Sequence, residues 1–242
     1  MRIWLGFLYL PVPLKTTIPD RGIMANPSEP FESDTIYHVY NHGNGDEMIF
    51  RERENYRFFL ERFKVYISHI AWIYVYCLVP NHFHFLIRVK SEKILVDYFK
   101  EKYPDKVKSA SGERSAMSQK DIADLVSNQF KNFLISYSKS FNKMYGRRGS
   151  LFLDNFERIP VSDDDYFTNM IRYIHFNPVL HGFTESLYQW KFSSIHAYLS
   201  DKRSMIRRQD VTEWFGGTGQ FKKFHQFIQE DEFESVKHLT LE

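Results

Sequence analysis

The sequence predicts an α+β fold in which an antiparallel sheet carries helices packed on one face. Segments of strand composition and segments of helical periodicity follow one another in the order strand, helix, strand, strand, helix, strand, helix. Two of the strands are separated only by Pro80 and Asn81, which favours a tight antiparallel hairpin. The 242 residues, 43% of them hydrophobic, are enough to bury the core of one large domain.

The first half of this domain is predicted to contain a strand, a helix and the hairpin. Residues 34–41, DTIYHVYN, are rich in β-branched and aromatic side chains and lead into the turn-forming HGNGD. Residues 52–69 carry apolar side chains at helical spacing, which predicts an amphipathic helix. Residues 71–79 and 82–89 have the composition of strands and form the two arms of the hairpin.

The middle of the chain changes in composition and then returns to helical periodicity. Residues 91–120 are charged and include a Ser/Gly-rich piece, so we expect a short helix followed by a mobile loop. Residues 121–145 place a row of aromatic and aliphatic side chains on one helical stripe, and GRRGS ends this helix.

A last strand and helix complete the predicted sheet domain. LFLDNFERIPV, residues 151–161, has strand composition. The next segment begins with Ser162 as the expected N-cap, followed by an acidic first turn. We expect its helix to reach Asn177 and stop before Pro178, with Gly182 as the cap.

These elements define three parts of the chain. Residues 34–200 form the domain, residues 201–242 an accessory helical tail, and residues 1–33 an extension expected to be disordered or mis-started, with Met24 as the start. A weak export signal is the alternative for the extension. We favour the first interpretation because the apolar run 3–10 is too short to span a bilayer and precedes two prolines.

Overall charge and cysteine content exclude some classes of protein. The net charge is only +2, so an extended basic field for nucleic acid must be local if it exists. Cys77 is the only cysteine, which excludes an internal disulfide framework and a cysteine-rich zinc site and is typical of a reducing cytoplasm.

Two histidines stand one residue apart in CLVPNHFHFLIRVK, residues 77–90. Because side chains alternate along a strand, His82 and His84 share one face, with backbones about 6.5 to 7 Å apart, while the neighbouring phenylalanines face the helices. Both imidazoles on this open face can converge on one cation or phosphate. Mg²⁺ or Mn²⁺ suits such a pair better than structural zinc, which needs four ligands. The alternative is a pair of half-exposed strand histidines that bind nothing.

Five stretches occur in order between residues 34 and 200. They are YHVYNHGN (37–44), YCLVPNHFHFLI (76–87), SYSKSFNKMYGRRGSLF (136–152), YIHFNPVLHGF (173–183) and WKFSSIHAYL (190–199). Together they resemble the single-tyrosine HUH transposases of the IS200-like group, particularly the REP-associated tyrosine transposases. This resemblance implies a ferredoxin/RRM-like HUH fold.

The resemblance also implies a chemistry. Members of the family cleave single-stranded DNA with a tyrosine, form a 5′-phosphotyrosine link and use a histidine-bound divalent cation. The aligned nucleophile is Tyr137 in SYSKSFN, and His82 and His84 would hold Mg²⁺ or Mn²⁺. Two alternatives stay open, because Tyr137 lies on an apolar stripe and is also a candidate core residue, and because Tyr145 is a nearby rival.

A third metal ligand is not identified by the motifs. In relatives a polar side chain one helical turn beyond the tyrosine completes the site, and Phe141 occupies that position here. Asn142 is adjacent but about 140° around a regular helix from Tyr137. We take Asn142 as the candidate, with His38 or water as alternatives.

Basic residues gather in the region that would contact DNA phosphates, and GRRGS adds backbone amides in a turn. A solvated helix end is the alternative interpretation. The candidate DNA-binding residues are Lys131, Lys139, Lys143, Arg147, Arg148 and Arg158, against the two acidic residues Asp154 and Glu157.

The function expected from this combination is a transposase-like nuclease and strand transferase acting on single-stranded or hairpin DNA. We expect a cytoplasmic, nucleoid-associated protein without membrane contact, acting as a monomer or homodimer. One alternative is a domesticated DNA-binding protein that does not cleave. Another is an RNA-binding module, which would need aromatic side chains on an open sheet face.

Overall fold

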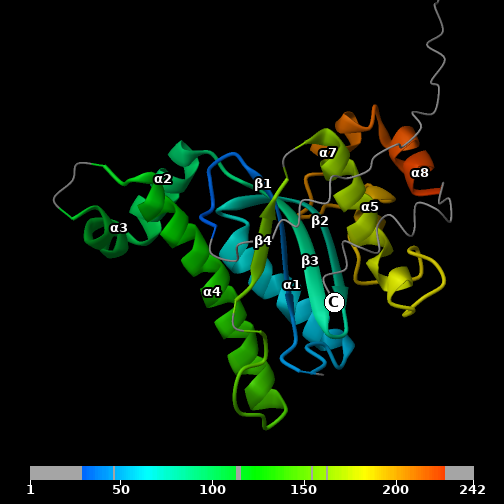
Figure 1. Cartoon of the computed structure of the whole chain (residues 1–242), viewed down its shortest axis with the longest axis horizontal. Helices are drawn as coiled ribbons and strands as arrows, with labels where there is room; N and C mark the ends of the chain where they lie inside the picture. Colours follow the sequence, from blue (N-terminus) through cyan, green and yellow to red (C-terminus); the bar gives the residue numbers. More distant parts are fainter. Residues whose placement is uncertain (1–28, 46, 113–115, 154, 162, 227–242) are drawn as a thin grey trace, which may run out of the picture.

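The computed structural model describes residues 29–45, 47–112, 116–153, 155–161 and 163–226. The predictions for residues 1–28 and for the end of the accessory tail lie outside the described residues. Four antiparallel strands form one sheet in the order β2-β3-β1-β4 (Figure 1). The strands are β1 (Ile36–His42), β2 (Ala71–Val79), β3 (His82–Val89) and β4 (Glu157–Pro160). The predicted α+β fold with an antiparallel sheet is confirmed.

Helices surround this sheet. They are α1 (Arg53–Ile67), α2 (Glu92–Lys102), α3 (Pro104–Ser111), α4 (Gln119–Met144), α5 (Asp164–Leu180), α6 (Ile195–Tyr198), α7 (Arg208–Trp214) and α8 (Thr218–Gln226). The expectation of a loop after the first helix of the 91–120 region is wrong for α3, which begins with Pro104 at its first position, where a missing N–H costs nothing. The long helix α4 begins earlier than expected because Ser118 and Asp121 form a capping box.

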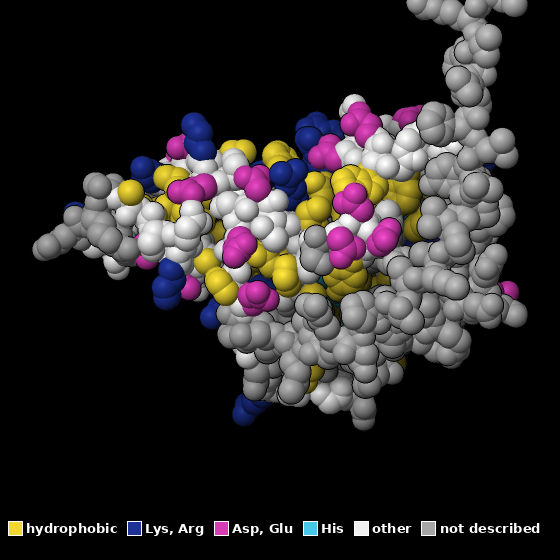
Figure 2. All heavy atoms as spheres, turned by 45° about the horizontal axis from the view of Figure 1, so that its top comes forward, with side chains coloured by type: hydrophobic (Ala, Val, Ile, Leu, Met, Phe, Trp, Pro, Cys, Tyr) yellow, Lys and Arg dark blue, Asp and Glu magenta, His cyan; other side chains and the backbone are white. Residues whose placement is uncertain are grey.

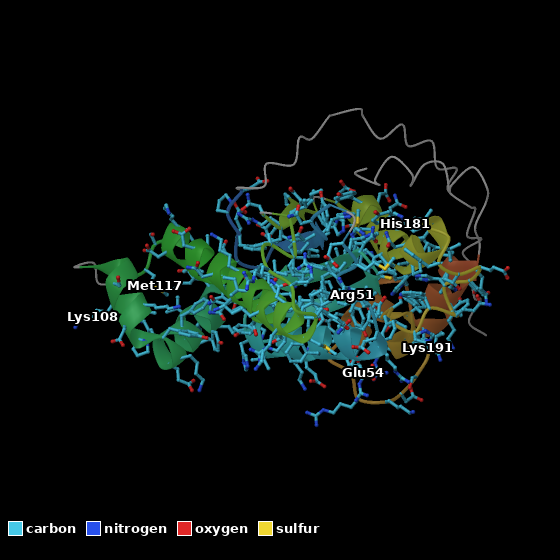
Figure 3. The ribbon with its side chains drawn as sticks, turned by 90° about the horizontal axis from the view of Figure 1, so that it is seen from below. Arg51, Glu54, Lys108, Met117, His181 and Lys191 are labelled. Carbon is cyan, nitrogen blue, oxygen red and sulfur yellow. The ribbon has the colours of Figure 1, made fainter. Side chains whose placement is uncertain are left out.

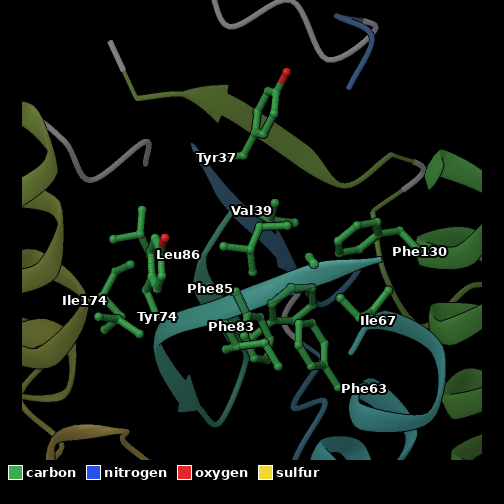
Figure 4. Packing of buried hydrophobic residues seen from close by; sticks show 14 of the residues in the cluster. Tyr37, Val39, Phe63, Ile67, Tyr74, Phe83, Phe85, Leu86, Phe130 and Ile174 are labelled. Atoms are coloured by element: carbon green, nitrogen blue, oxygen red, sulfur yellow. The ribbon is translucent and has the colours of Figure 1, made fainter. Parts of the chain in front are cut away.

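One face of the sheet packs against α1 and α4 through aromatic side chains. The rings of Phe63 and Phe85 stack with centroids 3.8 Å apart and planes 5° apart. Phe133 of α4 meets Phe63 edge-on, with centroids 5.3 Å apart. All three side chains are buried, so their apolar area holds the two helices on the strands. Figure 4 shows Phe63 and Phe85 in this core.

The other face of the sheet is covered by α5, which contradicts the prediction of helices on one face only. Leu86 of β3, Tyr74 of β2 and Ile174 of α5 are buried together on this side (Figure 4). Phe167 of α5 meets Tyr74 edge-on at 5.9 Å. The apolar residues of β2 and β3 therefore serve two cores, one on each side of the sheet. Alternation along one strand could not reveal this, because histidines among them resemble a solvated face.

Helix α5 begins and ends differently from the prediction. Its N-cap is Asp163, whose side chain accepts a hydrogen bond from the Tyr166 N–H, and Ser162 lies outside the described residues. Pro178 lies inside the helix, which continues to Leu180. Proline removes one backbone donor, but so close to the end the remaining turn is still closed by the His181 N–H and the Asn177 carbonyl. Gly182, at φ 69°, ends the helix as predicted.

The C-terminal part of the chain closes the β2 edge of the sheet. Ser193 forms an antiparallel bridge with Cys77, and Ile206 forms a parallel bridge with Ile73. Behind α5, a buried hydrogen-bonded series joins this part to the helix. Ser194 Oγ and His175 Nε2 are 2.9 Å apart, and His175 Nδ1 and His225 Nε2 are also 2.9 Å apart. Helices α5 and α8 are thereby held together.

This series predicts that the fold loses stability in acid. Burial lowers the pKa of His225 to about 4 from the usual 6.5. A histidine with a lowered folded pKa contributes its full stability above pH 6.5 and loses it as the pH falls from 6.5 to 4, where the unfolded chain binds the extra proton. For His225 the loss between pH 7.5 and 5.0 is about 2 kcal/mol. Urea unfolding at pH 7.5 and pH 5.0 measures the free energy of unfolding at each pH. We expect the loss of this free energy between the two pH values to be about 2 kcal/mol smaller in His225→Gln than in the wild type. An equal loss in the variant and the wild type would contradict the prediction that His225 contributes to the loss of stability in acid.

Candidate functional site

Five of the histidines in the described residues gather on the α5 side of the sheet. In the antiparallel register of β1 and β3, His42 lies opposite His82 and Tyr40 lies opposite His84. Side-chain alternation places His38 on the same face of β1. The rings of His42 and His82 stack with centroids 4.5 Å apart. The sequence prediction that His82 and His84 share a face is confirmed.

Helix α5 places two further polar side chains over these histidines. Tyr173 and Asn177 are four residues apart, so they lie on one face of the helix. The Tyr173 ring lies edge-on to His84, with centroids 5.3 Å apart, and to His38, with centroids 6.1 Å apart. His175, two residues away, points to the opposite side of the helix and joins the C-terminal series.

Asn177 bridges the histidine pair. Its Oδ1 lies 3.0 Å from Nε2 of His82, and its Nδ2 lies 3.1 Å from Nε2 of His84. Asn177 is fully buried, and the two histidines are nearly so. Both Nε2 atoms therefore point at one carboxamide in a site shielded from water.

Each ring nitrogen of His82 faces an acceptor oxygen, but a neutral imidazole has only one hydrogen to donate. Nδ1 of His82 lies 2.9 Å from Oδ1 of Asn81, and Nε2 lies 3.0 Å from Oδ1 of Asn177. A neutral imidazole carries one N–H, so it can donate to only one of these two acceptors. Burial lowers the pKa of His82 to about 3, which disfavours the doubly protonated ring. A cation between His82 and Asn177 would satisfy the remaining pair of acceptors.

The donor set fits a divalent cation with open coordination positions. Ligand atoms at right angles around an ion with bonds of about 2.1 Å are about 3 Å apart, which is the separation of Asn177 Oδ1 and His82 Nε2. Nε2 of His84 lies beside the other end of the same carboxamide, 3.1 Å from Nδ2. Within the described part of the chain, no group of three or more His, Cys, Asp or Glu side chains is arranged to hold a metal. The set is therefore His82, His84 and the Asn177 amide oxygen, which suits Mn²⁺, or Mg²⁺ with several waters, better than structural zinc.

Tyr137 lies on the opposite side of the sheet from the histidines. Its ring packs against Phe59 at 4.9 Å, and its hydroxyl donates a hydrogen bond to the Ile49 carbonyl at 2.5 Å. Burial raises the pKa of Tyr137 well above its usual value. This placement contradicts the expectation that Tyr137 acts with the histidine pair, and it supports the alternative of a core residue.

Asn142 is also separate from the histidines. Its Nδ2 donates to the Gly149 carbonyl and its Oδ1 accepts from Arg147, so it closes the turn after α4. Phe141 is buried next to Tyr137 on the same side of the sheet. The Asn142 ligand prediction is therefore contradicted. His38, the other candidate, contacts the site through His84.

Only some of the predicted DNA-binding residues are free to meet a phosphate. Arg158 is buried, with its guanidinium 4.8 Å from the centre of the Phe31 ring, so its assignment as a DNA contact is wrong. Arg147 pairs with Glu47 at 2.7 Å. The remaining four, Lys131, Lys139, Lys143 and Arg148, are exposed. Acidic and basic side chains are interspersed on the face shown in Figure 2.

The histidine cluster approaches the surface where β1 ends. His42 and His181 are half-buried, and the rings of His181 and His82 are 4.7 Å apart. The GRRGS loop returns to the same end, because the Leu153 N–H donates to the His42 carbonyl. Figure 3 shows His181 and Lys191 on the half of the molecule opposite Lys108. The exposed cations near GRRGS and the entrance to the histidines thus lie at one end of the sheet.

Tyr173 and Asn177 are the site residues that the sequence prediction missed. The signal was present in YIHFNP, where a tyrosine and an amide are one helical turn apart. Pro178 follows this pair, which in the sequence favours a helix end. Contact with the histidines depends on α5 covering the second face of the sheet, which the strand pattern did not indicate.

Comparisons with known proteins give little further information. No protein-family model and no curated protein matches the chain. One solved structure, "Structure of the REP associates tyrosine transposase bound to a REP hairpin", is similar over 72% of this chain and 83% of that one, with a TM-score of 0.46 and 15% identity. None of the described helices is long and apolar enough to cross a membrane.

Proposed function

We propose that the protein is a transposase-like enzyme that cleaves and rejoins single-stranded or hairpin DNA through Tyr173. The observation that carries this proposal is the position of Tyr173 and Asn177 on one face of α5, in contact with His84. A nucleophile and a candidate cation site are thereby adjacent. The five ordered sequence motifs support the same reaction class. All of these groups come from one chain, so the proposed site needs no second protomer.

The chemistry required of Tyr173 is attack on a phosphodiester. The Tyr173 oxygen loses its proton and bonds to phosphorus, and the bond from phosphorus to the 3′ oxygen breaks. The leaving 3′ oxygen takes up a proton and becomes a 3′-hydroxyl, so the step is balanced. The 5′-phosphotyrosine link retains the bond energy, so a 3′-hydroxyl of another strand can reverse the step and join. A divalent cation on His82, His84 and Asn177 would supply charge for the phosphate oxygens. The buried ring contacts of Tyr173 hold its side chain in one orientation for this attack.

A second candidate is a hairpin-binding protein that no longer cleaves. The observation in its favour is burial, since Tyr173 is 2% exposed and Asn177 fully buried. A phosphate must then enter from the half-buried end at His42 and His181. The RNA-binding alternative loses its basis, because α5 covers the face on which bases would stack.

A labelled library of hairpins with single-stranded flanks separates the first two candidates. With Mn²⁺ or Mg²⁺ the wild type should form an adduct that survives denaturation. Replacing His82 and His84 together by alanine should abolish the adduct while DNA affinity changes less than about threefold, since we expect the exposed cations near GRRGS to supply most of the phosphate contacts. His69→Ala is the matched control, because His69 stacks on Tyr98 away from the site. Binding without adduct across the library would favour the second candidate.

A further inference from the structure

His38 is a buried histidine for which the proposed reaction has no direct use. It lies on β1 and is 4% exposed. Its Nε2 is 2.9 Å from Nδ1 of His84, and its ring packs against Tyr40 at 4.8 Å and Tyr173 at 6.1 Å. Burying a second imidazole costs free energy that an aliphatic residue would avoid, so the contact with His84 calls for a reason.

The positions of the hydrogens in this contact follow from Asn177. The Asn177 Nδ2 group is a donor only, so Nε2 of His84 accepts its hydrogen bond and carries no hydrogen. The single hydrogen of a neutral His84 is then on Nδ1 and points at Nε2 of His38. His38 must accept there, which places its own hydrogen on Nδ1.

His82 has the same arrangement with a different partner. Its Nδ1 lies 2.9 Å from Oδ1 of Asn81, an acceptor that takes the hydrogen when Nε2 binds a cation instead of donating to Asn177. With a cation bound beside Asn177, both histidines of the pair therefore direct unprotonated Nε2 atoms towards it. His38 contacts Nδ1 of His84, and Asn81 contacts Nδ1 of His82.

We propose that His38 is a positioning residue that holds His84 in the Nδ1–H tautomer, and that Asn81 does the same for His82, so that both Nε2 lone pairs face a divalent cation. This inference rests on the proposed function. Metal-ligating histidines commonly donate their other N–H to a fixed acceptor, and losing that acceptor weakens metal binding about 10- to 100-fold. His38 would contribute through His84 without touching the cation or the DNA.

Manganese binding by the full chain without DNA tests this role independently of cleavage. In His38→Phe, which keeps an aromatic ring but offers no acceptor, the dissociation constant for Mn²⁺ should rise about 10- to 100-fold. His38→Gln, which restores an acceptor oxygen, should recover most of the affinity. Tyr40→Phe is the matched control, because Tyr40 is equally buried and its ring also contacts His84, at 5.7 Å. Its affinity should stay within about threefold of the wild type.

The tautomer itself can be observed in the metal-free wild type by ¹⁵N nuclear magnetic resonance of the imidazole nitrogens. We expect His84 with its hydrogen on Nδ1. Hydrogen on Nε2 of His84, no Mn²⁺ binding by the wild type, or equal losses in His38→Phe and Tyr40→Phe would each overturn the proposal. If His38→Phe does not fold, the wild-type spectrum still tests the proposal, because it shows which nitrogen of His84 carries the hydrogen. A chain that binds Mn²⁺ as expected but forms no DNA adduct would contradict the proposed function and leave the role of His38 standing.

Discussion

Tyr173→Phe should lower covalent adduct formation with hairpin DNA by at least about 10³-fold, because the substitution removes the attacking oxygen and keeps the aromatic ring. The ring contacts of Tyr173 with His38 and His84 depend on the aromatic carbon frame, which phenylalanine keeps. Manganese affinity and DNA affinity should therefore change little. The measurement is the initial rate of adduct formation on a denaturing gel, at matched DNA occupancy.

Tyr137→Phe is the decisive control for this prediction. It removes the hydrogen bond to the Ile49 carbonyl and should cost about 1 kcal/mol of stability, since one buried acceptor loses its partner. Adduct formation should persist, because Tyr137 lies across the sheet from the histidines. The reverse result, an adduct that persists in Tyr173→Phe and vanishes in Tyr137→Phe, would refute the nucleophile assignment and imply a rearrangement of α4.

Phe59→Ala should lower the free energy of unfolding by about 3 to 5 kcal/mol, the range for removing a fully buried phenylalanine. Phe59 is 0% exposed and stands where α1, α4 and the sheet meet. Truncation leaves a cavity that α1 cannot close without losing its contact with β3. Its ring neighbours are Phe50 at 4.9 Å, Phe83 at 5.1 Å, Phe133 at 4.7 Å and Tyr137 at 4.9 Å.

Urea unfolding at pH 7.5, followed by circular dichroism, measures the effect of Phe59→Ala. The matched control is Phe183→Ala on the loop after α5, because Phe183 is 40% exposed and should cost less than about 1 kcal/mol. Equal losses in the two variants would mean that the aromatic core between α1, α4 and the sheet is not the main source of stability.

The sheet and its order along the chain were predictable because they depend on local patterns. Strand composition, the Pro80 and Asn81 turn and the helical stripe of α1 each identify an element without knowledge of the others. Element ends were less predictable. Asp163, rather than Ser162, caps α5, and the helix continues past Pro178, because tertiary packing of the last turn outweighs the loss of one backbone hydrogen bond.

The candidate site was half predictable. His82 and His84 follow from alternation within one strand, a property of eight consecutive residues. Their partners follow from which helix lies over them, a contact between residues 90 or more positions apart. Tyr137 is the aligned tyrosine of the motif SYSKSFN, but it also lies on an apolar helical stripe, and in the structure its side chain is buried in the core. The charge of Arg158 alone predicts a phosphate contact, whereas the backbone carbonyl of Glu29 and two aromatic rings hold its side chain in the interior.

The most direct test of the central claim is to locate the DNA attachment by mass spectrometry. The adduct formed with Mn²⁺ would be trimmed with nuclease and digested with trypsin, which releases residues 173–191 in one peptide and residues 132–139, with Tyr137, in another. Fragmentation separates Tyr173 from Tyr188 within the first peptide. We expect the nucleotide on Tyr173. A nucleotide on Tyr137 or on any other tyrosine would contradict the claim that α5 supplies the nucleophile to the histidine pair.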